Sequence, residues 1–172
     1  MFLKRLYPFL FVFIIFAGCG KKDFNEDCCG LEPLAVEIKE AYLYLPNAFT
    51  PNGDGLNDYF MPFTNKFISK IQTFKVLQDG KTVFEKNDFS PNTTYFGWNG
   101  KDESGKVNQG IFDFQIQVLH KNGETFSYEG KVCCRSEYPL SCVENEGKCF
   151  FPSQHDGSGG LNKSLPTWES CQ

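Results

Sequence analysis

A short loop, residues 52–58 (NGDGLND), carries the side chains best suited to bind a metal ion. Oxygen-bearing side chains at Asn52, Asp54 and Asp58 alternate with glycines, and the main-chain carbonyl of Leu56 lies between them. Calcium requires hard oxygen ligands of this kind, so we predict a calcium site in the loop. The glutamate that completes an EF-hand is missing, which excludes that motif. The alternative is a turn whose side-chain oxygens accept hydrogen bonds from their own main-chain amides.

Eight cysteines in 172 residues are the second chemical feature. This content favours an oxidising, exported location, and the lack of C-x-x-C spacing argues against a zinc or thioredoxin-like site. Seven of the eight are disulfide candidates: Cys28, Cys29, Cys133, Cys134, Cys142, Cys149 and Cys171. Seven choices of the odd cysteine, each with 15 connectivities, leave 105 schemes, so spacing selects none. We expect residues 28–29 and 133–134 to join the two ends of the domain, and the other three to tie down the tail.

The first residues predict export and a lipid anchor. A basic start is followed by an apolar run from Leu6 to Ala17, which is too short to span a bilayer. FAGC at residues 16–19 resembles the lipobox of bacterial lipoproteins. The resemblance implies a cleaved signal peptide of residues 1–18, a lipid on Cys19 and a tether of residues 19–30. We expect a lipid-anchored cell-envelope protein, most simply in the outer membrane, on its periplasmic or surface face. An ordinary secretory signal followed by a structural cysteine is the alternative.

Composition and charge exclude some classes of protein. With 41% hydrophobic and 22% charged residues the chain is globular, and its 19 phenylalanines favour sheet over helix. The 17 basic and 21 acidic residues give a net charge of -4, and removing residues 1–18 leaves 15 basic and 21 acidic residues, or -6. Without a basic surplus to neutralise phosphates, nucleic acid is not an expected partner.

Few other residues suggest binding or catalysis. Trp98 is a candidate ligand contact, a ring on which a sugar would stack with Tyr95 and Phe96 nearby, although a core position is favoured. Asp102, in the turn after Trp98, is a further candidate calcium ligand. Neither histidine lies in a Ser/His/Asp or Cys/His signature, and no carboxylate pair can be assigned as acid and base. We therefore expect no enzyme activity.

These residues need a scaffold, and residues 31–135 alternate between strands and turns. The clearest strand, residues 111–120, is apolar at every second position, and Asn122-Gly123 turns the chain into a second strand at 125–134. The dipeptide Asp79-Gly80 indicates another hairpin. The other expected strands are residues 34–38, 41–45, 59–63, 71–77 and 82–85. The pattern predicts an all-β fold, an immunoglobulin-like antiparallel β-sandwich followed by a disulfide-rich C-terminal tail at residues 136–172.

A family resemblance emerges from three stretches of sequence. Residues 44–58, YLPNAFTPNGDGLND, resemble the opening of the gliding motility-associated C-terminal domain. FKVLQDGKTVFE at residues 74–85 is similar to that family's central hairpin, and WNGKD at 98–102 with GIFDF at 110–114 is similar to its later turns. The resemblance covers about residues 42–135. It implies an immunoglobulin-like sandwich in a Bacteroidota protein, and commonly a type B sorting signal of the type IX secretion system at the extreme C-terminus of large proteins.

Taken together, these features predict a non-enzymatic cell-envelope lipoprotein. Its gliding motility- and type IX secretion-associated β-sandwich would serve as a structural or protein-interaction module. Because residues 136–172 follow the region of resemblance, we expect lipoprotein transport to replace type IX export. The expected partners are the membrane, through the N-terminal lipid, and envelope or surface proteins. The alternatives are a glycan- or ligand-binding surface module and a residual type IX sorting domain.

Overall fold

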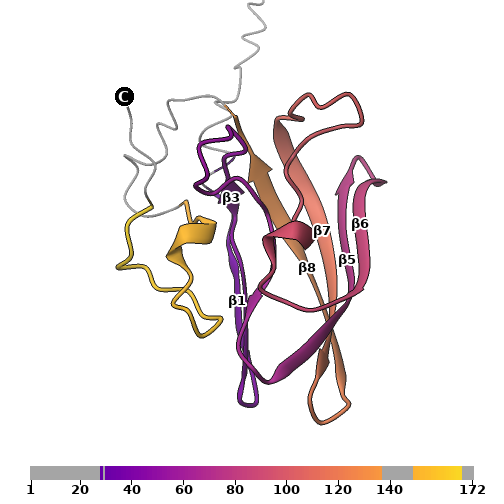
Figure 1. Ribbon diagram of the computed structural model, residues 1–172, viewed down its shortest axis with the longest axis vertical. Coiled ribbons are helices and arrows are strands. Elements are labelled where there is room, and N and C mark those ends of the chain that lie inside the picture. The colour runs from indigo at the N-terminus through magenta and orange to yellow at the C-terminus, as the bar shows by residue number, and fades with distance from the viewer. Residues whose placement is uncertain (1–27, 29, 137–148, 168–172) are drawn as a thin grey trace, which may run out of the picture.

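The computed structural model describes residues 28, 30–136 and 149–167, which form two β-sheets packed face to face (Figure 1). The small sheet has the strand order β1–β2–β4, and the large sheet has the order β3–β8–β7–β5–β6. The strands are β1 (Leu34–Ile38), β2 (Ala41–Leu45), β3 (Ala48–Phe49), β4 (Phe63–Thr64), β5 (Ile68–Gln78), β6 (Lys81–Phe89), β7 (Gly110–His120) and β8 (Thr125–Cys134), with two short 3₁₀ helices, η1 (Thr94–Phe96) and η2 (Pro152–Gln154). The predicted all-β sandwich is confirmed.

The hairpin of β7 and β8 forms the centre of the large sheet, and its side chains alternate as predicted. Phe114 and Ile116 are buried between the sheets, whereas Asp113 and Gln115 lie on the outer face. Gly130 of β8 pairs with Phe114 across the hairpin. A Cβ atom on Gly130 would lie 2.6 Å from the Phe114 ring, so the ring occupies the space that any side chain at this position would need.

The remaining strands differ from the prediction in length and, at one edge, in direction. β5 and β6 extend beyond the predicted residues and are joined by Asp79 and Gly80, whose φ angles of 50° and 75° are typical of a tight hairpin. The strand expected at 59–63 is reduced to one bridge at Phe60 and the short β4. β3 pairs in parallel with β8, so the antiparallel prediction is wrong there. Two residues separate β2 from β3, and the chain passes there from the small sheet to the large sheet.

Aromatic side chains dominate the core between the sheets. Trp98 is 2% exposed, and its ring centroid lies 5.4 Å from that of Phe49 and 4.7 Å from that of Phe112. Phe60 stacks on Phe49 and makes a tilted pair with Phe114. Aromatic pairs of these kinds contribute about 0.5–1.5 kcal/mol each beyond the apolar area that they bury. The core position that the sequence favoured for Trp98 is therefore confirmed.

Residues 149–167 form a third layer on the outer face of the small sheet. Figure 1 shows this segment in yellow beside β1, on the side of the small sheet that faces away from the large sheet. Leu161 packs against a buried cluster of Tyr44, Met61 and Phe63, and the His155 ring stacks on Phe63 at 4.4 Å. The side chains of β2 are consequently buried on both faces of the small sheet, except at Tyr42.

The two adjacent cysteines of β8 differ in their bonding. Cys133 forms a disulfide with Cys28, which joins the two ends of the domain as expected. Cys134 is a buried free thiol, so the second bond expected from this pair is not formed at Cys134. Successive side chains of a strand point to opposite faces, so Cys133 faces the N-terminal segment while Cys134 packs in the main core. Burial raises the pKa of the Cys134 thiol to about 12.

The predicted leader and lipid anchor lie outside the described residues. These are the signal peptide (residues 1–18), Cys19 with most of the tether, and Cys29, Cys142 and Cys171. Cys149 is described and is buried beside the Cys28–Cys133 disulfide. Within the described part of the chain, no helix is long and apolar enough to cross a membrane.

Replacing both Cys28 and Cys133 by alanine should lower the free energy of unfolding by about 2–5 kcal/mol. The disulfide closes a loop with a sequence separation of 105 and so restricts the unfolded chain strongly. Urea unfolding without reductant measures the change, and Cys134→Ala is the matched control because it removes a sulfur from the same strand without opening the loop. Equal unfolding midpoints for the double variant and this control would contradict the expected role of the disulfide.

Candidate functional site

The calcium-candidate loop directly follows the stretch where the chain passes from β2 to β3. We call residues 44–58 the signature segment. It begins at Tyr44 in the small sheet, contributes β3 to the large sheet and ends in the loop predicted to bind calcium. The segment therefore lies where the two sheets and the tail meet (Figure 1).

The loop of residues 52–58 is organised by its own side chains. The Asp58 carboxylate accepts hydrogen bonds from the amides of Gly53 (2.7 Å) and Gly55 (2.8 Å). Asn52 Oδ1 accepts a hydrogen bond from the Asp54 amide at 3.0 Å, and Asp54 Oδ1 accepts one from the Leu56 amide at 2.8 Å. Gly53 and Gly55 have φ angles of 86° and 90°, which a residue with a Cβ rarely adopts. The alternative that the sequence left open, a turn closed by its own side-chain oxygens, is observed.

The same oxygens are the predicted calcium ligands. Asn52, Asp54 and Asp58 offer them from one loop, and an oxygen that accepts one amide keeps a second lone pair for a cation. Asn52 also donates to Asp54 Oδ2 at 3.0 Å, which directs its amide nitrogen towards the same carboxylate. Among the described residues, no group of three or more His, Cys, Asp or Glu side chains could hold a metal ion. A cation here would therefore depend on two carboxylates, an amide oxygen and the Leu56 carbonyl.

Asp102, the further candidate ligand, organises a turn of its own. Its Oδ1 accepts from the Ser104 hydroxyl at 2.6 Å and from the amides of Ser104 and Lys106 at 2.8 and 3.0 Å. The hydrogen bond from the Ser104 hydroxyl is the main reason why the pKa of Asp102 lies below its ordinary value. The loop at 52–58 and the turn at Asp102 are thus two separate hydrogen-bonded units.

Asn47 connects three separate segments of the chain, and sequence reasoning did not single it out. It is fully buried. Its Nδ2 donates to the Leu31 carbonyl, and its Oδ1 accepts from the Phe150 amide, both at 2.6 Å. Its own main chain donates to the Phe150 carbonyl at 3.1 Å and accepts from the Cys133 amide at 2.8 Å. One residue therefore contacts the N-terminal segment, β8 and the tail.

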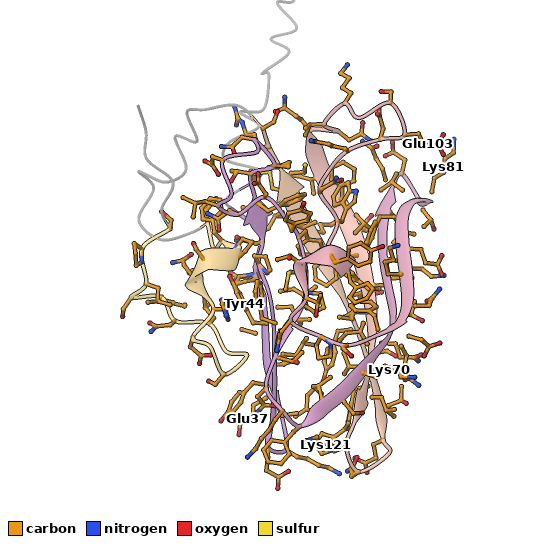
Figure 2. The ribbon with its side chains drawn as sticks, in the orientation of Figure 1. Glu37, Tyr44, Lys70, Lys81, Glu103 and Lys121 are labelled. Carbon is orange, nitrogen blue, oxygen red and sulfur yellow. A yellow bond between two sulfur atoms is a disulfide. The ribbon has the colours of Figure 1, made fainter. Side chains whose placement is uncertain are left out.

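Two further residues of the signature segment bind the tail. Asn57 Oδ1 accepts from the Ser153 amide, and Asn57 Nδ2 donates to the Thr167 carbonyl, both at 2.9 Å. The Tyr44 hydroxyl donates to the Phe151 carbonyl at 2.9 Å, and burial raises the pKa of this phenol above its ordinary value. Figure 2 labels Tyr44 at the boundary between the tail and the small sheet. The sequence held one signal for this contact, because β2 (AYLYL) is apolar on both faces and such strands are covered on both sides.

Of the three rings proposed to stack on a sugar, those of Tyr95 and Phe96 contact each other, with 5.1 Å between their centroids, whereas Trp98 is buried. Trp98 is a core residue, so its assignment as a ligand contact is corrected: its faces pack on other aromatic rings and are closed to a ligand. Phe96 packs on Phe89, with 5.0 Å between ring centroids. Tyr95 is 79% exposed and is the only one of the three candidate rings that a sugar could reach from solvent.

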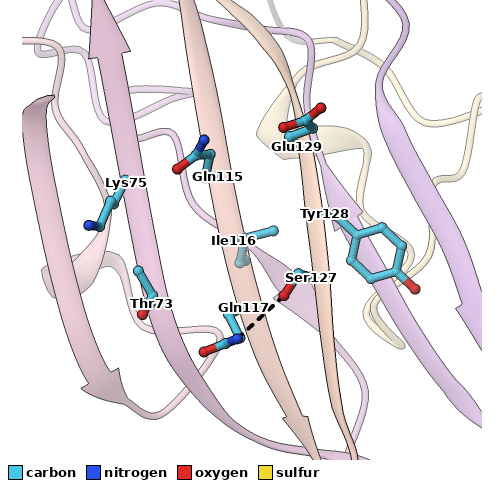
Figure 3. A pocket seen from close by; sticks show the side chains of 8 residues that line it. All are labelled: Thr73, Lys75, Gln115, Ile116, Gln117, Ser127, Tyr128 and Glu129. Atoms are coloured by element: carbon cyan, nitrogen blue, oxygen red, sulfur yellow. Dashed lines mark hydrogen bonds between the residues drawn. The ribbon is translucent and has the colours of Figure 1, made fainter. Parts of the chain in front are cut away.

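A shallow groove of about 380 Å³ runs over the outer face of the large sheet (Figure 3). Its outward-facing side chains are mostly polar: Thr73, Lys75, Gln115, Gln117, Ser127 and Glu129. Gln117 donates to the Ser127 hydroxyl at 3.4 Å, and Lys75 forms a salt bridge with Glu85 at 3.4 Å. Several of these side chains thus satisfy one another, as is typical of a solvent-facing sheet surface.

The comparisons with known proteins agree with this architecture. A model of the family described as the CHU_C type IX secretion signal domain matches residues 43–133. No curated protein matched the chain. The matched region contains β2 to β8 almost entirely, together with the calcium-candidate loop and the two asparagines that bind the tail. Because it covers more than half of the 172 residues, the chain belongs to the CHU_C type IX secretion signal domain family.

Proposed function

We propose that this protein is a lipid-anchored envelope protein in which the type IX secretion-related β-sandwich serves as a protein-interaction or structural module without enzyme activity. One observation carries the proposal: the last strand of the family domain is built into the rest of the chain. In a domain that acts as a sorting signal at a C-terminus, the end of this strand is also the end of the protein.

The end of β8 is held on three sides. Cys133 is joined to Cys28 by the disulfide, and its amide donates to Asn47. The amide of Arg135 donates to the Phe49 carbonyl at 3.2 Å. Residues 149–167 then pack against the small sheet, with Phe151 beside the disulfide. These contacts support a domain whose final strand has a structural role in place of a terminal recognition role.

The disulfide also limits how far the domain lies from the proposed lipid. Nine residues of chain lead from Cys19 to Cys28 and span at most about 30 Å when fully extended. Cys28 is bonded at the end of β8, so that end of the sandwich would lie nearest the membrane. The opposite end, with the hairpin tips where Lys39 pairs with Glu124, would face away from it.

Each of two alternative functions is supported by a specific observation. Membership of a type IX secretion signal family favours a retained sorting role. The exposure of Tyr95 favours a glycan-binding surface, with Tyr95 in place of Trp98 as the stacking ring.

The Cys19→Ser variant should lose membrane attachment. Without the thiol no lipid can be added, and the acyl chains contribute about 0.8 kcal/mol per buried methylene. Fractionation of cells into membrane and soluble material, followed by immunoblotting, measures the distribution. Cys134→Ala is the matched control and should stay with the membranes. Recovery of Cys19→Ser in membranes at the wild-type level would contradict the anchor.

Export should not depend on the type IX system. The measurement is the amount of the protein in the envelope of a strain that lacks the type IX translocon, relative to the parent strain. Equal amounts are expected, and a genuine type IX substrate in the same strain serves as the positive control. Loss of the protein from the mutant's envelope would establish the sorting role instead.

The loop at 52–58 should bind calcium weakly, with a dissociation constant of about 10⁻⁴ to 10⁻³ M, as extracellular modules do. A cation that binds only the folded chain stabilises it by about 1.4 kcal/mol when the free calcium concentration is ten times the dissociation constant. This corresponds to a rise of several degrees in melting temperature. The measurement is the melting temperature in excess calcium minus that in excess chelator.

The controls separate the cation from the hydrogen bonds of the turn. Asp54→Ala should melt lower than wild type even in chelator, since the Leu56 amide loses its acceptor, and should show no calcium-dependent shift. Asp113→Ala, which removes an exposed carboxylate of the large sheet, should keep the shift. A wild-type melting temperature that is the same in calcium and in chelator would leave the loop as a turn alone.

A further inference from the structure

The tail contacts the sandwich in the way that a bound peptide contacts its receptor. Every hydrogen bond described above from Tyr44, Asn47 and Asn57 to the tail goes to a main-chain atom. The contacted atoms are the amide and carbonyl of Phe150, the carbonyl of Phe151, the amide of Ser153 and the carbonyl of Thr167. The hydrogen-bonding groups on the receptor side are thus supplied by one stretch of fifteen residues, the signature segment.

One side chain of the tail acts as an apolar anchor. Phe151 is fully buried in a cluster with Cys28, Ala48, Cys133 and Cys149, next to the disulfide. A ring enclosed by a pocket that also binds the neighbouring main chain is the usual arrangement of a peptide-binding site. The signature segment and the disulfide together therefore form a receptor for an extended segment with a large apolar side chain at one position.

The tail also makes hydrogen bonds within itself. Gln154 Oε1 accepts from the Phe151 amide at 3.0 Å, and Gln154 Nε2 donates to the Leu165 carbonyl at 3.2 Å. The Gln154 carbonyl accepts from the Asn162 amide at 2.8 Å. A ligand that carries its own turns loses less conformational entropy on binding, which favours binding from another molecule as well as from the same chain.

We propose that the outer face of the small sheet and the signature segment form a peptide-binding site, and that this site exchanges its ligand, residues 149–167, with a second copy of the chain. Any two copies present the same site and the same ligand, so each contact made within one chain can be made between two. Residues 137–148 join the domain to the ligand, and twelve extended residues can span roughly 40 Å, enough to reach a neighbouring molecule. The inference rests on the proposed interaction module and names its site and partner.

The test uses two full-length variants that complement each other. The first, Phe151→Ala, keeps the site and loses the anchor of its own tail. The second, Tyr44→Phe with Asn57→Gly, keeps the tail and loses three hydrogen bonds of the site; glycine preserves the positive φ of Asn57. Both carry Cys149→Ser, so that no covalent bond from Cys149 holds a tail in place. Each variant alone should be a monomer by analytical ultracentrifugation, and their mixture should form a 1:1 dimer.

A peptide of residues 149–167 with Cys149→Ser gives a second readout. It should bind the Phe151→Ala chain saturably in fluorescence anisotropy. Adding Tyr44→Phe and Asn57→Gly to that chain should weaken binding by at least about tenfold, while adding Asn87→Ala, an exposed asparagine of β6, should leave it unchanged. If Phe151→Ala does not unfold cooperatively, the titration is made on the wild-type chain with Cys149→Ser, cleaved after folding at a protease site inserted between residues 137 and 148.

The outcomes separate this inference from the proposed function. A mixture that stays monomeric where the peptide binds overturns the exchange, and a peptide that binds no chain, or binds equally after the site substitutions, overturns the site itself. Neither readout involves the lipid or export, so the fractionation of Cys19→Ser is unaffected by either result.

Discussion

The buried residue Asn47 hydrogen-bonds to three segments that are distant in the sequence. Its side-chain amide contacts Leu31 and Phe150, and its main-chain carbonyl accepts the amide of Cys133. A buried polar group left without a partner costs about 1–3 kcal/mol, so these segments can pack only in positions that satisfy this one residue. The N-terminal segment, the end of β8 and the tail therefore meet at this one residue, and the Cys28–Cys133 disulfide links the first two of them covalently.

Those parts of the fold that depend on local alternation could be predicted from the sequence. In β7 and β8 the apolar residues recur at every second position and Asn122-Gly123 marks the turn. The two strands, their buried faces and their pairing could therefore all be predicted. β3 could not be predicted because a strand of two residues shows no periodicity, and its parallel pairing depends on where the chain changes sheet. The packing of the tail could not be predicted because the tail contributes main-chain atoms to these hydrogen bonds. Every residue has such atoms, so no sequence pattern reveals the contacts.

The loop at 52–58 shows why spacing alone cannot settle a cation site. Main-chain amides and calcium both bind side-chain oxygens, so the order of Asn52, Asp54 and Asp58 along the chain suits either one. The position of the loop and the two possible uses of its oxygens could be predicted, but the choice between a cation and the main-chain amides could not. Asn57 illustrates the opposite case: it looked like one more polar loop residue, yet its left-handed φ turns its amide to face the tail.

The neighbouring cysteines of β8 also bear on how the chain reaches its native pairing. A slip of β8 by one residue would turn Cys134 towards Cys28, but it would move Phe126 and Val132 from the inner face to the outer face. Whichever cysteine is left over lies next to the bond just formed, where its thiolate can attack it and restart the search. In the native register that thiol is Cys134, buried and with a pKa of about 12, so almost no thiolate remains. In the native register, burial therefore deprives Cys134 of the thiolate with which it would attack the neighbouring disulfide.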